Sequence, residues 1–259
     1  MENYQIISNQ VEQFKRLKED VTRVMMMYQF ALNELETKIE ILKEEFQLLH
    51  DYNPIEHTKS RVKAFDSIIG KIQRKGLPFS IESIRHGIKD IAGIRITCSF
   101  ISDIYHIQEM LEKHFDVEIY ESKDYIKNPK PNGYRSLHLI AGVPVVMTTG
   151  REMVCVEIQI RTIAMDFWAS LEHKIFYKYN EAVPAHLIRE LKQAADAANV
   201  LDQQMERLHK EITIIKEKQS HDEQDEFTKL ILSRVGQSNL KLPPIIEQEL
   251  QSDQDNESK

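Results

Sequence analysis

Residues 93–100, GIRITCSF, and residues 154–160, VCVEIQI, decide the fold class, because both segments are rich in residues that favour β-strands. Residues 115–120 and 137–146 are β-rich as well, and sequence with helical spacing of apolar residues lies on both sides of this region. We therefore predict an α/β (α+β) fold, in which a central mixed β-sheet of about five strands is flanked by helices, with long N- and C-terminal helices.

The flanking segments predict particular helices. Apolar residues from Phe14 to Leu49 recur at steps of three and four, which predicts one long or once-broken amphipathic helix that ends before Pro54. Further helices are predicted at 57–75, at 104–114 behind a Ser102-Asp103 cap, and from 162 to about 179.

A heptad pattern follows Pro184 and predicts a coiled-coil or bundle helix, whereas the acidic sequence beyond Lys218 predicts a mostly disordered tail with a short helix at 227–235. These patterns divide the chain into four parts. They are an N-terminal amphipathic helical region (1–52), a β-rich core (53–183), a C-terminal heptad helix that packs on the core or an oligomer (184–218), and the tail (219–259).

The composition limits the class of protein. Residues 139–147 form the longest nearly unbroken apolar run, far shorter than the ~20 residues of a membrane-spanning helix. The first twenty residues contain no cationic segment followed by an apolar one, and two cysteines are too few for a disulfide scaffold or a four-ligand zinc site. We predict a cytoplasmic protein with no membrane partner.

The distribution of charge matters more than its sum. The chain of 259 residues carries a formal net charge of −7. Residues 219–259 hold nine Asp/Glu against four Lys/Arg, whereas residues 61–95 hold eight Lys/Arg against three Asp/Glu. Lys63, Lys71 and Arg74 would share one face of the predicted 57–75 helix, where they either bind a polyanion or form an ordinary solvated surface.

Two acids stand in apolar sequence. Asp90 precedes a predicted strand, and the alternation of 154–160 places Glu157 on the polar face together with Gln159. Asp90 either caps a turn, with Glu157 facing water, or the two carboxylates hold Mg²⁺ together with substrate phosphates.

The polar stretch 121–136 is too long for a hairpin turn, and it carries Tyr134 close to Lys130 and His138. This arrangement suits base stacking with phosphate contacts, although Tyr134 as a lid over the core is equally consistent.

The chain lacks a phosphate-binding Gly-Lys-Ser/Thr loop, a Rossmann glycine signature and a Ser elbow. Cys98 and Cys155 are interpreted as buried strand residues. Together these features indicate a nucleotide-handling site without identifying its reaction.

The chain contains four motifs, PIEHTKSRVKAFDSI, DIAGIRITCSFISDI, DYIKNPKPNGYRSLHL and VEIQIRTIAMDFWASLEHKIFYK. These motifs resemble the synthetase domain of the RelA/SpoT-homologue family. Within that family the resemblance is strongest to the stand-alone small alarmone synthetases of the RelP subgroup. The resemblance implies a nucleotidyltransferase-like synthetase fold and transfer of pyrophosphate from ATP to the 3′-hydroxyl of GDP or GTP. The products would be AMP and ppGpp or pppGpp, with no hydrolase activity.

The resemblance also implies roles for individual residues. Asp90 and Glu157 would be catalytic and bind Mg²⁺, and Glu157 is the candidate base for the 3′-hydroxyl. On the ATP side, Arg61 and Arg95 would clamp adenine, while the phosphates would be held by Lys63, Lys71 and Arg74. On the GDP/GTP side, Tyr134 would stack on guanine, and the remaining contacts would come from Lys123, Lys130, His138, Gln159 and Asp166.

The family resemblance further implies a homotetramer, in which the N-terminal amphipathic helix and the C-terminal heptad helix could form the contacts between subunits. The basic surface also allows RNA as a regulator. His57 and Lys59 stand where an alarmone-activated sister subgroup has Phe and Thr, which argues against strong activation by product. Two alternatives remain from the residues alone. One is a non-catalytic oligomeric module that binds single-stranded RNA, and the other is a nucleotidyltransferase that releases pyrophosphate from ATP.

Overall fold

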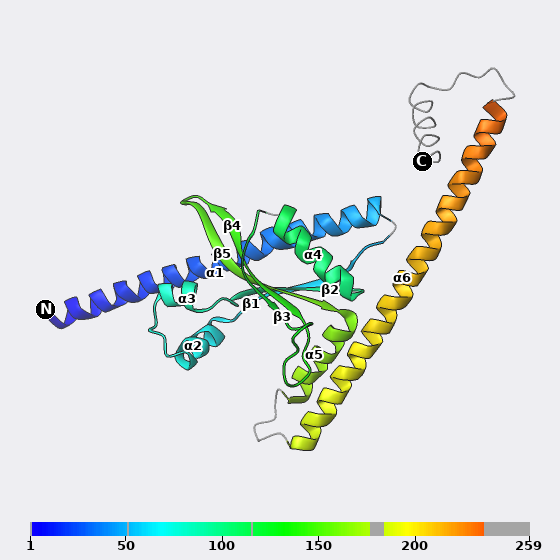
Figure 1. Cartoon of the computed structure of the whole chain (residues 1–259). Coiled ribbons are helices and arrows are strands. Elements are labelled where there is room, and N and C mark those ends of the chain that lie inside the picture. The colour runs from blue at the N-terminus through cyan, green and yellow to red at the C-terminus, as the bar shows by residue number, and fades with distance from the viewer. Residues whose placement is uncertain (1, 51, 115, 177–183, 236–259) are drawn as a thin grey trace. The chain divides into compact units, whose positions relative to one another are not determined.

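The computed structural model describes residues 2–50, 52–114, 116–176 and 184–235, and its centre is a five-stranded mixed sheet (Figure 1). The strand order is β1-β2-β5-β4-β3, and only β2 and β5 pair in parallel. The bounds are β1 Ile55–Val62, β2 Ala92–Cys98, β3 Glu118–Asp124, β4 Leu137–Met147 and β5 Gly150–Thr162. The predicted fold class is confirmed.

Six helices surround the sheet: α1 Glu2–Leu49, α2 Phe65–Arg74, α3 Ile81–Gly87, α4 Ile101–His114, α5 Ile163–Phe176 and α6 Ala185–Val235. α1 and α4 lie against one face of the sheet (Figure 1). Leu35 of α1 and Ile104 of α4 are fully buried there with Ile94 and Ile158 of the central strands. Burying four such side chains stabilises the fold by several kcal/mol at about 1.5–3 kcal/mol each. The predicted long N-terminal helix is confirmed.

The predicted helix over 57–75 is wrong in its first half. Residues 55–62 form β1, which pairs antiparallel with β2, and only Phe65–Arg74 is helical. β1 is an edge strand whose side chains are mostly exposed, so it lacks the apolar alternation by which a strand is usually recognised. Lys63 therefore follows a strand and does not share a helix with Lys71.

Two helix boundaries also differ from prediction, and a third lies outside the described residues. α4 begins at Ile101, and Asp103 of its first turn accepts a hydrogen bond from the backbone N–H of Phe100, which is the N3-to-N-cap contact of a capping box. α5 is described to Phe176, so the expected end near 179 lies outside the described residues. α6 continues past the expected end at Lys218 to Val235 and contains the short helix expected at 227–235, because no glycine or proline interrupts it before Gly236. The rest of the expected tail, 236–259, lies outside the described residues.

The chain forms two compact units, Met1–Glu206 and Arg207–Lys259. Within the first unit, α6 packs on α5 and on the loop before β4. Trp168 donates its indole N–H to the carbonyl of Leu191, and Gly133 lies so close to α6 that a Cβ there would stand 2.5 Å from the Cβ of Ala195. Among the described residues, no helix combines the length and the hydropathy that crossing a lipid bilayer requires.

A buried carboxylate anchors α6 to the end of β5. The hydroxyl of Thr162 donates to Oδ2 of Asp202 at 2.7 Å, and Asp202 is 7% exposed. Burial raises the pKa of Asp202 to about 6, although the Thr162 hydrogen bond opposes the shift. Since the pKa is higher in the folded chain than the ordinary 3.8, this carboxyl favours folding when protonated. That contribution is lost as the pH rises through about 6.

We expect Asp202→Asn to stabilise the chain at pH 8 by up to about 3 kcal/mol, because Asn keeps the acceptor for Thr162 and cannot ionise. The gain should shrink as the pH is lowered toward 4. Urea denaturation of the full chain at both pH values measures it. Asp196→Asn, at an exposed ion pair with Lys192 on the same helix, is the control and should show no such gain. A pH-independent effect of Asp202→Asn would contradict the prediction.

Candidate active site

The strand register places a polar row across all five strands on the face opposite α1 and α4, which we call the site face. Arg95 of β2 is opposite Gln159 of β5, and Gln159 is opposite His138 of β4. Side chains in register point to the same face of a sheet. The complete row is Lys59, Arg95, Gln159, His138 and Lys123.

The adjacent row contains Arg61, Gly93 and Glu157 on β1, β2 and β5. Gly93 has no side chain, so the site face is open between Arg61 and Glu157. Arg61 and Arg95 are diagonal neighbours across β1 and β2, a spacing of roughly 7–8 Å that leaves room for a flat ring between two guanidinium groups.

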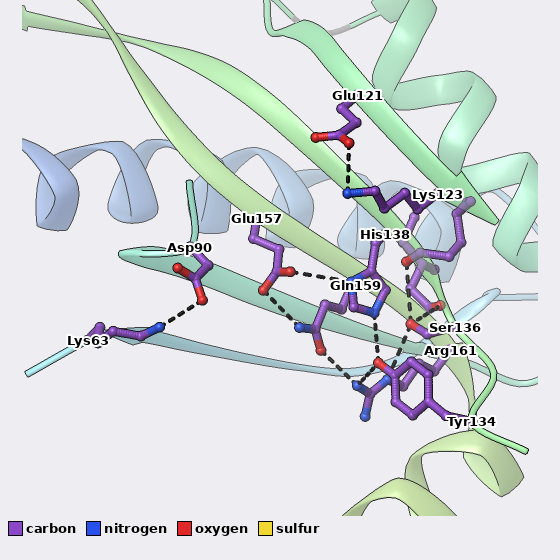
Figure 2. A network of polar contacts seen from close by, with 12 residues as sticks. Lys63, Asp90, Glu121, Lys123, Tyr134, Ser136, His138, Glu157, Gln159 and Arg161 are labelled. Atoms are coloured by element: carbon purple, nitrogen blue, oxygen red, sulfur yellow. Dashed lines mark hydrogen bonds and ion pairs between the residues drawn. The ribbon is translucent and has the colours of Figure 1, made fainter. Parts of the chain in front are cut away.

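Asp90 lies just before β2 and is held by two ammonium groups. Lys63 and Lys71 each contact Oδ2 of Asp90 at 2.7 Å (Figure 2 shows the Lys63 contact). Burial alone would raise the pKa of Asp90, but the two lysines outweigh it and hold the pKa below its ordinary value. The other oxygen, Oδ1, is buried and makes no hydrogen bond with any residue that the structure describes.

Glu157 is the second acid of the site. Its Oε1 lies 3.3 Å from Nδ1 of His138, and its Oε2 accepts a hydrogen bond from the amide of Gln159 at 2.9 Å (Figure 2). Burial would raise the pKa of Glu157, as would the charge of Asp90, yet the contacts with His138 and Gln159 keep the pKa below its ordinary value. Both acids are therefore ionised at neutral pH.

Two clefts meet at these acids. One, of about 230 Å³, contains Lys59, Arg61 and Arg95 beside Asp90 and Glu157. The other, of about 300 Å³, is lined by Asp90 and Glu157 together with five lysines and with Tyr125 and His138; the lysines are Lys71, Lys75, Lys89, Lys123 and Lys130. Each cleft has a basic wall, and the two carboxylates are common to both. This arrangement can hold two polyanions with their reacting groups side by side.

Tyr134 is oriented at the second cleft by several partners. Its hydroxyl lies 2.7 Å from Nε2 of His138, and the ammonium of Lys130 lies 4.7 Å from its ring centroid. Lys130 stands at the same distance from the ring of Tyr125. Tyr134 thus contacts both the polar row and the basic loop, as a side chain that positions a ligand at this cleft would.

The sequence analysis missed Lys75, Lys89 and Tyr125, which line the second cleft, and it missed Arg161, which organises the side chains around it. Arg161 is 4% exposed, and its Nη2 donates to the hydroxyl of Tyr134 at 2.6 Å and to Oε1 of Gln159 at 2.8 Å (Figure 2). Its Nη1 donates to Oδ1 of Asp166 at 3.2 Å, and the same oxygen lies 2.9 Å from Nη1 of Arg95. Arg161 could have been found from the sequence, because strand alternation places residues 155, 157, 159 and 161 on the same face.

The structure brings together nearly all the residues selected from the sequence. Twelve of the thirteen line the two clefts or contact a residue that does: Arg61, Lys63, Lys71, Asp90, Arg95, Lys123, Lys130, Tyr134, His138, Glu157, Gln159 and Asp166. Arg74 is the exception. It is exposed in the last turn of α2 and lines neither cleft.

Comparison with known proteins gives the family. The family described as "Region found in RelA / SpoT proteins" matches residues 60–182. GTP pyrophosphokinase YwaC of Bacillus subtilis is 54% identical over 202 residues, which cover 78% of this chain and 96% of that protein. This chain belongs to the RelA/SpoT family. The resemblance found in the four motifs is thereby confirmed.

Solved structures of the RelA/SpoT family agree with the fold. The crystal structure of small alarmone synthetase 2 from Bacillus subtilis matches with a TM-score of 0.68 and 55% identity, covering 74% of this chain and 99% of that one. Small alarmone synthetase 1 from the same organism, bound to its product pppGpp, matches with a TM-score of 0.69 and 37% identity over 78% and 99% of the two chains. The family match at 60–182 contains every selected site residue.

Proposed function

We propose that this protein is a (p)ppGpp synthetase, a GTP/GDP diphosphokinase that transfers pyrophosphate from ATP to the 3′-hydroxyl of GDP or GTP. The observation that carries the proposal is the pair of basic clefts that share Asp90 and Glu157. A transfer between two nucleotides needs two such sites in contact, with the reacting groups held in line. The activity of the relatives, named as GTP pyrophosphokinases, supports it.

ATP is assigned to the cleft beside β1 and β2. Arg61 and Arg95 would hold adenine between their guanidinium planes, as their diagonal placement on the two strands allows. Lys63 and Lys71 converge on Asp90 and are placed to receive the phosphates. Arg74, which lines neither cleft, would reach the phosphates only from the rim.

GDP or GTP is assigned to the cleft of five lysines. Tyr134 would stack on guanine, and Lys123, Lys130 and His138 would contact the phosphates or the ribose. Gln159 lines the cleft assigned to ATP, and Asp166 lines neither cleft; both would act on the acceptor side only through Arg161, which also bonds to the Tyr134 hydroxyl. This density of cations suits an acceptor that carries a 5′-diphosphate or triphosphate.

Asp90 and Glu157 fit a divalent cation, which we infer to be Mg²⁺. Among the described residues, no three His, Cys, Asp or Glu side chains form a metal-binding group, so the protein offers two carboxylates rather than a full cage. Mg²⁺ prefers one or two carboxylates completed by substrate phosphates and water. The buried, unbonded Oδ1 of Asp90 is an oxygen ligand of the required kind. Bound there, the ion would neutralise phosphate charge.

In the proposed reaction, the 3′-oxygen of the acceptor forms a bond to the β-phosphorus of ATP. The bond between the β-phosphorus and the oxygen that bridges it to the α-phosphorus breaks. AMP leaves with that oxygen, and the 3′-hydroxyl gives up its proton. Glu157 is the candidate acceptor of this proton. Its lowered pKa makes it a weak base, so positioning and charge neutralisation must supply most of the catalysis.

We place the enzyme in the cytoplasm, where its substrates are, and infer a homotetramer as the working form. The heptad residues of α6 support the inference, because Leu201, Met205 and Leu208 are about half exposed in the single chain. RNA remains a proposed regulator through the basic clefts.

Incubation of the purified chain with ATP, GDP and Mg²⁺, followed by anion-exchange separation, tests the function. We expect AMP and ppGpp in equal amounts, and AMP and pppGpp when GTP is the acceptor. Release of pyrophosphate from ATP would instead indicate another nucleotidyltransferase. Absence of turnover with both acceptors would overturn the proposal and favour the RNA-binding module.

Deletion of residues 219–259 is expected to leave the activity within about twofold of the full chain. All site residues lie in the compact unit Met1–Glu206, and the deleted segment belongs entirely to the other unit. Steady-state rates of a chain that stops at Lys218 measure the effect. Circular dichroism confirms that the shortened chain is folded, and loss of turnover in a folded truncation would make the tail part of the enzyme.

A further inference from the structure

A third cavity, of about 380 Å³, lies between α1, α3 and the sheet, apart from the two substrate clefts. β5 begins at Gly150 but first pairs with β2 at Val156, so residues 153–155 pass beyond the start of β2. α1 and α3 close the space beside this part of β5. The volume is within the usual range of small-molecule sites, roughly 300–1,000 Å³.

One wall of the cavity is formed by a bulge and a glycine. Tyr120 is the extra residue of a β-bulge in β3, between Ile119 and Glu121, and bulges redirect side chains. Its hydroxyl lies over Gly142 of β4, where a Cβ would stand only 2.1 Å from the Tyr120 oxygen. The aromatic ring can therefore lie across the sheet only because residue 142 has no side chain. This places an aromatic surface at the cavity.

The interior contains a polar group without a partner. Tyr28 of α1 is 3% exposed and lines the cavity, and its hydroxyl makes no hydrogen bond with any residue that the structure describes. Burial raises the pKa of Tyr28 to about 12, with Cys155 and Arg85 near enough to act on it. The oxygen is accessible from the cavity rather than sealed in the core, so a ligand in the cavity can form a hydrogen bond with it. Met27 and Met153 complete an apolar, polarisable interior.

Two cationic side chains, Arg85 and Lys89, line the cavity together with His86, and none of the residues lining it is acidic. Lys89 pairs with Glu121 at 3.2 Å, so Arg85 is the cation on which the ligand must depend. Glu152 pairs with Arg85, with Oε2 2.6 Å from Nη2, and leaves the other guanidinium donors for a ligand. An apolar interior with a cationic border suits a ligand that has a ring at one end and a negative group at the other.

We propose that this cavity binds an aromatic anion the size of a nucleoside monophosphate. The ring lies among Met27, Tyr120 and Met153, the Tyr28 hydroxyl bonds to it, and the anionic group pairs with Arg85. Lys89 lines both this cavity and the acceptor cleft, which connects the two places. The site is separate from the proposed catalytic function, because neither Asp90 nor Glu157 lines it.

AMP is the probe, and its binding to the full chain is measured by calorimetric titration. The titration is done in excess α,β-methylene-ATP, which occupies the ATP cleft and prevents turnover. We expect one AMP per chain to bind under these conditions. Arg85→Gln should weaken this binding about tenfold or more, and Tyr28→Phe, which removes one hydroxyl, about fivefold. Adenosine and inorganic phosphate, each lacking half of the ligand, should bind at least tenfold more weakly than AMP.

Glu152→Gln is the matched control. It breaks the same ion pair as Arg85→Gln but leaves the cation at the cavity, so AMP affinity should stay within about twofold of the unaltered chain. Equal weakening by both variants would mean that the ion pair merely supports the fold. That result, absence of AMP binding in the unaltered chain, or equal affinity for adenosine and AMP would overturn the proposal.

Discussion

Asp90→Asn and Glu157→Gln are each expected to lower the rate of ppGpp synthesis by at least about a hundredfold while the chain stays folded. Each variant keeps the shape of its side chain and removes one of the two negative charges shared by the clefts. Loss of one well-placed electrostatic group in such a site costs ~3–4 kcal/mol of transition-state stabilisation, or a hundred- to thousandfold in rate. Initial rates of AMP and ppGpp formation at saturating substrates measure the loss.

The two variants should retain ATP binding. Asp90→Asn leaves Lys63 and Lys71 in place, and the two lysines no longer pair with a carboxylate, so they stay available to the ATP phosphates. The KM for ATP should therefore change by no more than a few-fold. Glu118→Gln, an exposed carboxylate of β3 outside both clefts, is the matched control and should turn over normally. Near-normal turnover of Asp90→Asn and Glu157→Gln would remove the basis of the metal assignment.

The sheet and its polar face could be predicted because strand alternation is local. In β5 the residues Val154, Val156 and Ile158 are buried, and Glu157 and Gln159 lie on the other face, as the sequence pattern requires. β1 could not be predicted by the same rule. It is an edge strand with Lys59 and Arg61 on the site face, so its pairing with β2 overrides a local pattern that favours a helix.

Convergence of Lys63 and Lys71 on one place was predicted for an incorrect reason, and that place, expected to be a polyanion, is occupied in the structure by Asp90. We placed Lys63 and Lys71 on one helix, whereas one follows β1 and the other belongs to α2, and both still reach the same carboxylate oxygen. Residue types can indicate the ligand class when the local structure is misassigned. Asp202 could not have been selected from sequence at all, since its heptad surroundings give no sign that Thr162, 40 residues away, would bond to it.

Arg161→Lys is expected to raise the KM for GDP about ten- to hundredfold and to lower kcat by less. Arg161 is a positioning residue, because its guanidinium holds the Tyr134 hydroxyl and the Gln159 amide at the acceptor cleft while it pairs with Asp166. Lysine keeps the charge, but its single nitrogen cannot bond to Tyr134, Gln159 and Asp166 at once as the planar guanidinium does. Each lost hydrogen bond to a charged group is worth about 1.5–3 kcal/mol.

The KM values for GDP and for ATP in the same variant separate positioning from general destabilisation. Asp166 retains Arg95 when Arg161 is altered, so the ATP side should lose little, whereas an unfolded fraction would lower kcat and leave both KM values unchanged. Ser136→Ala removes the contact of Arg161 Nε at 3.3 Å and the hydrogen bond of the serine hydroxyl to the carbonyl of Ile160, but it leaves the Arg161 contacts with Tyr134, Gln159 and Asp166, so its KM for GDP should be close to normal. An unchanged KM for GDP in Arg161→Lys would show that Tyr134 and Gln159 are held without this arginine.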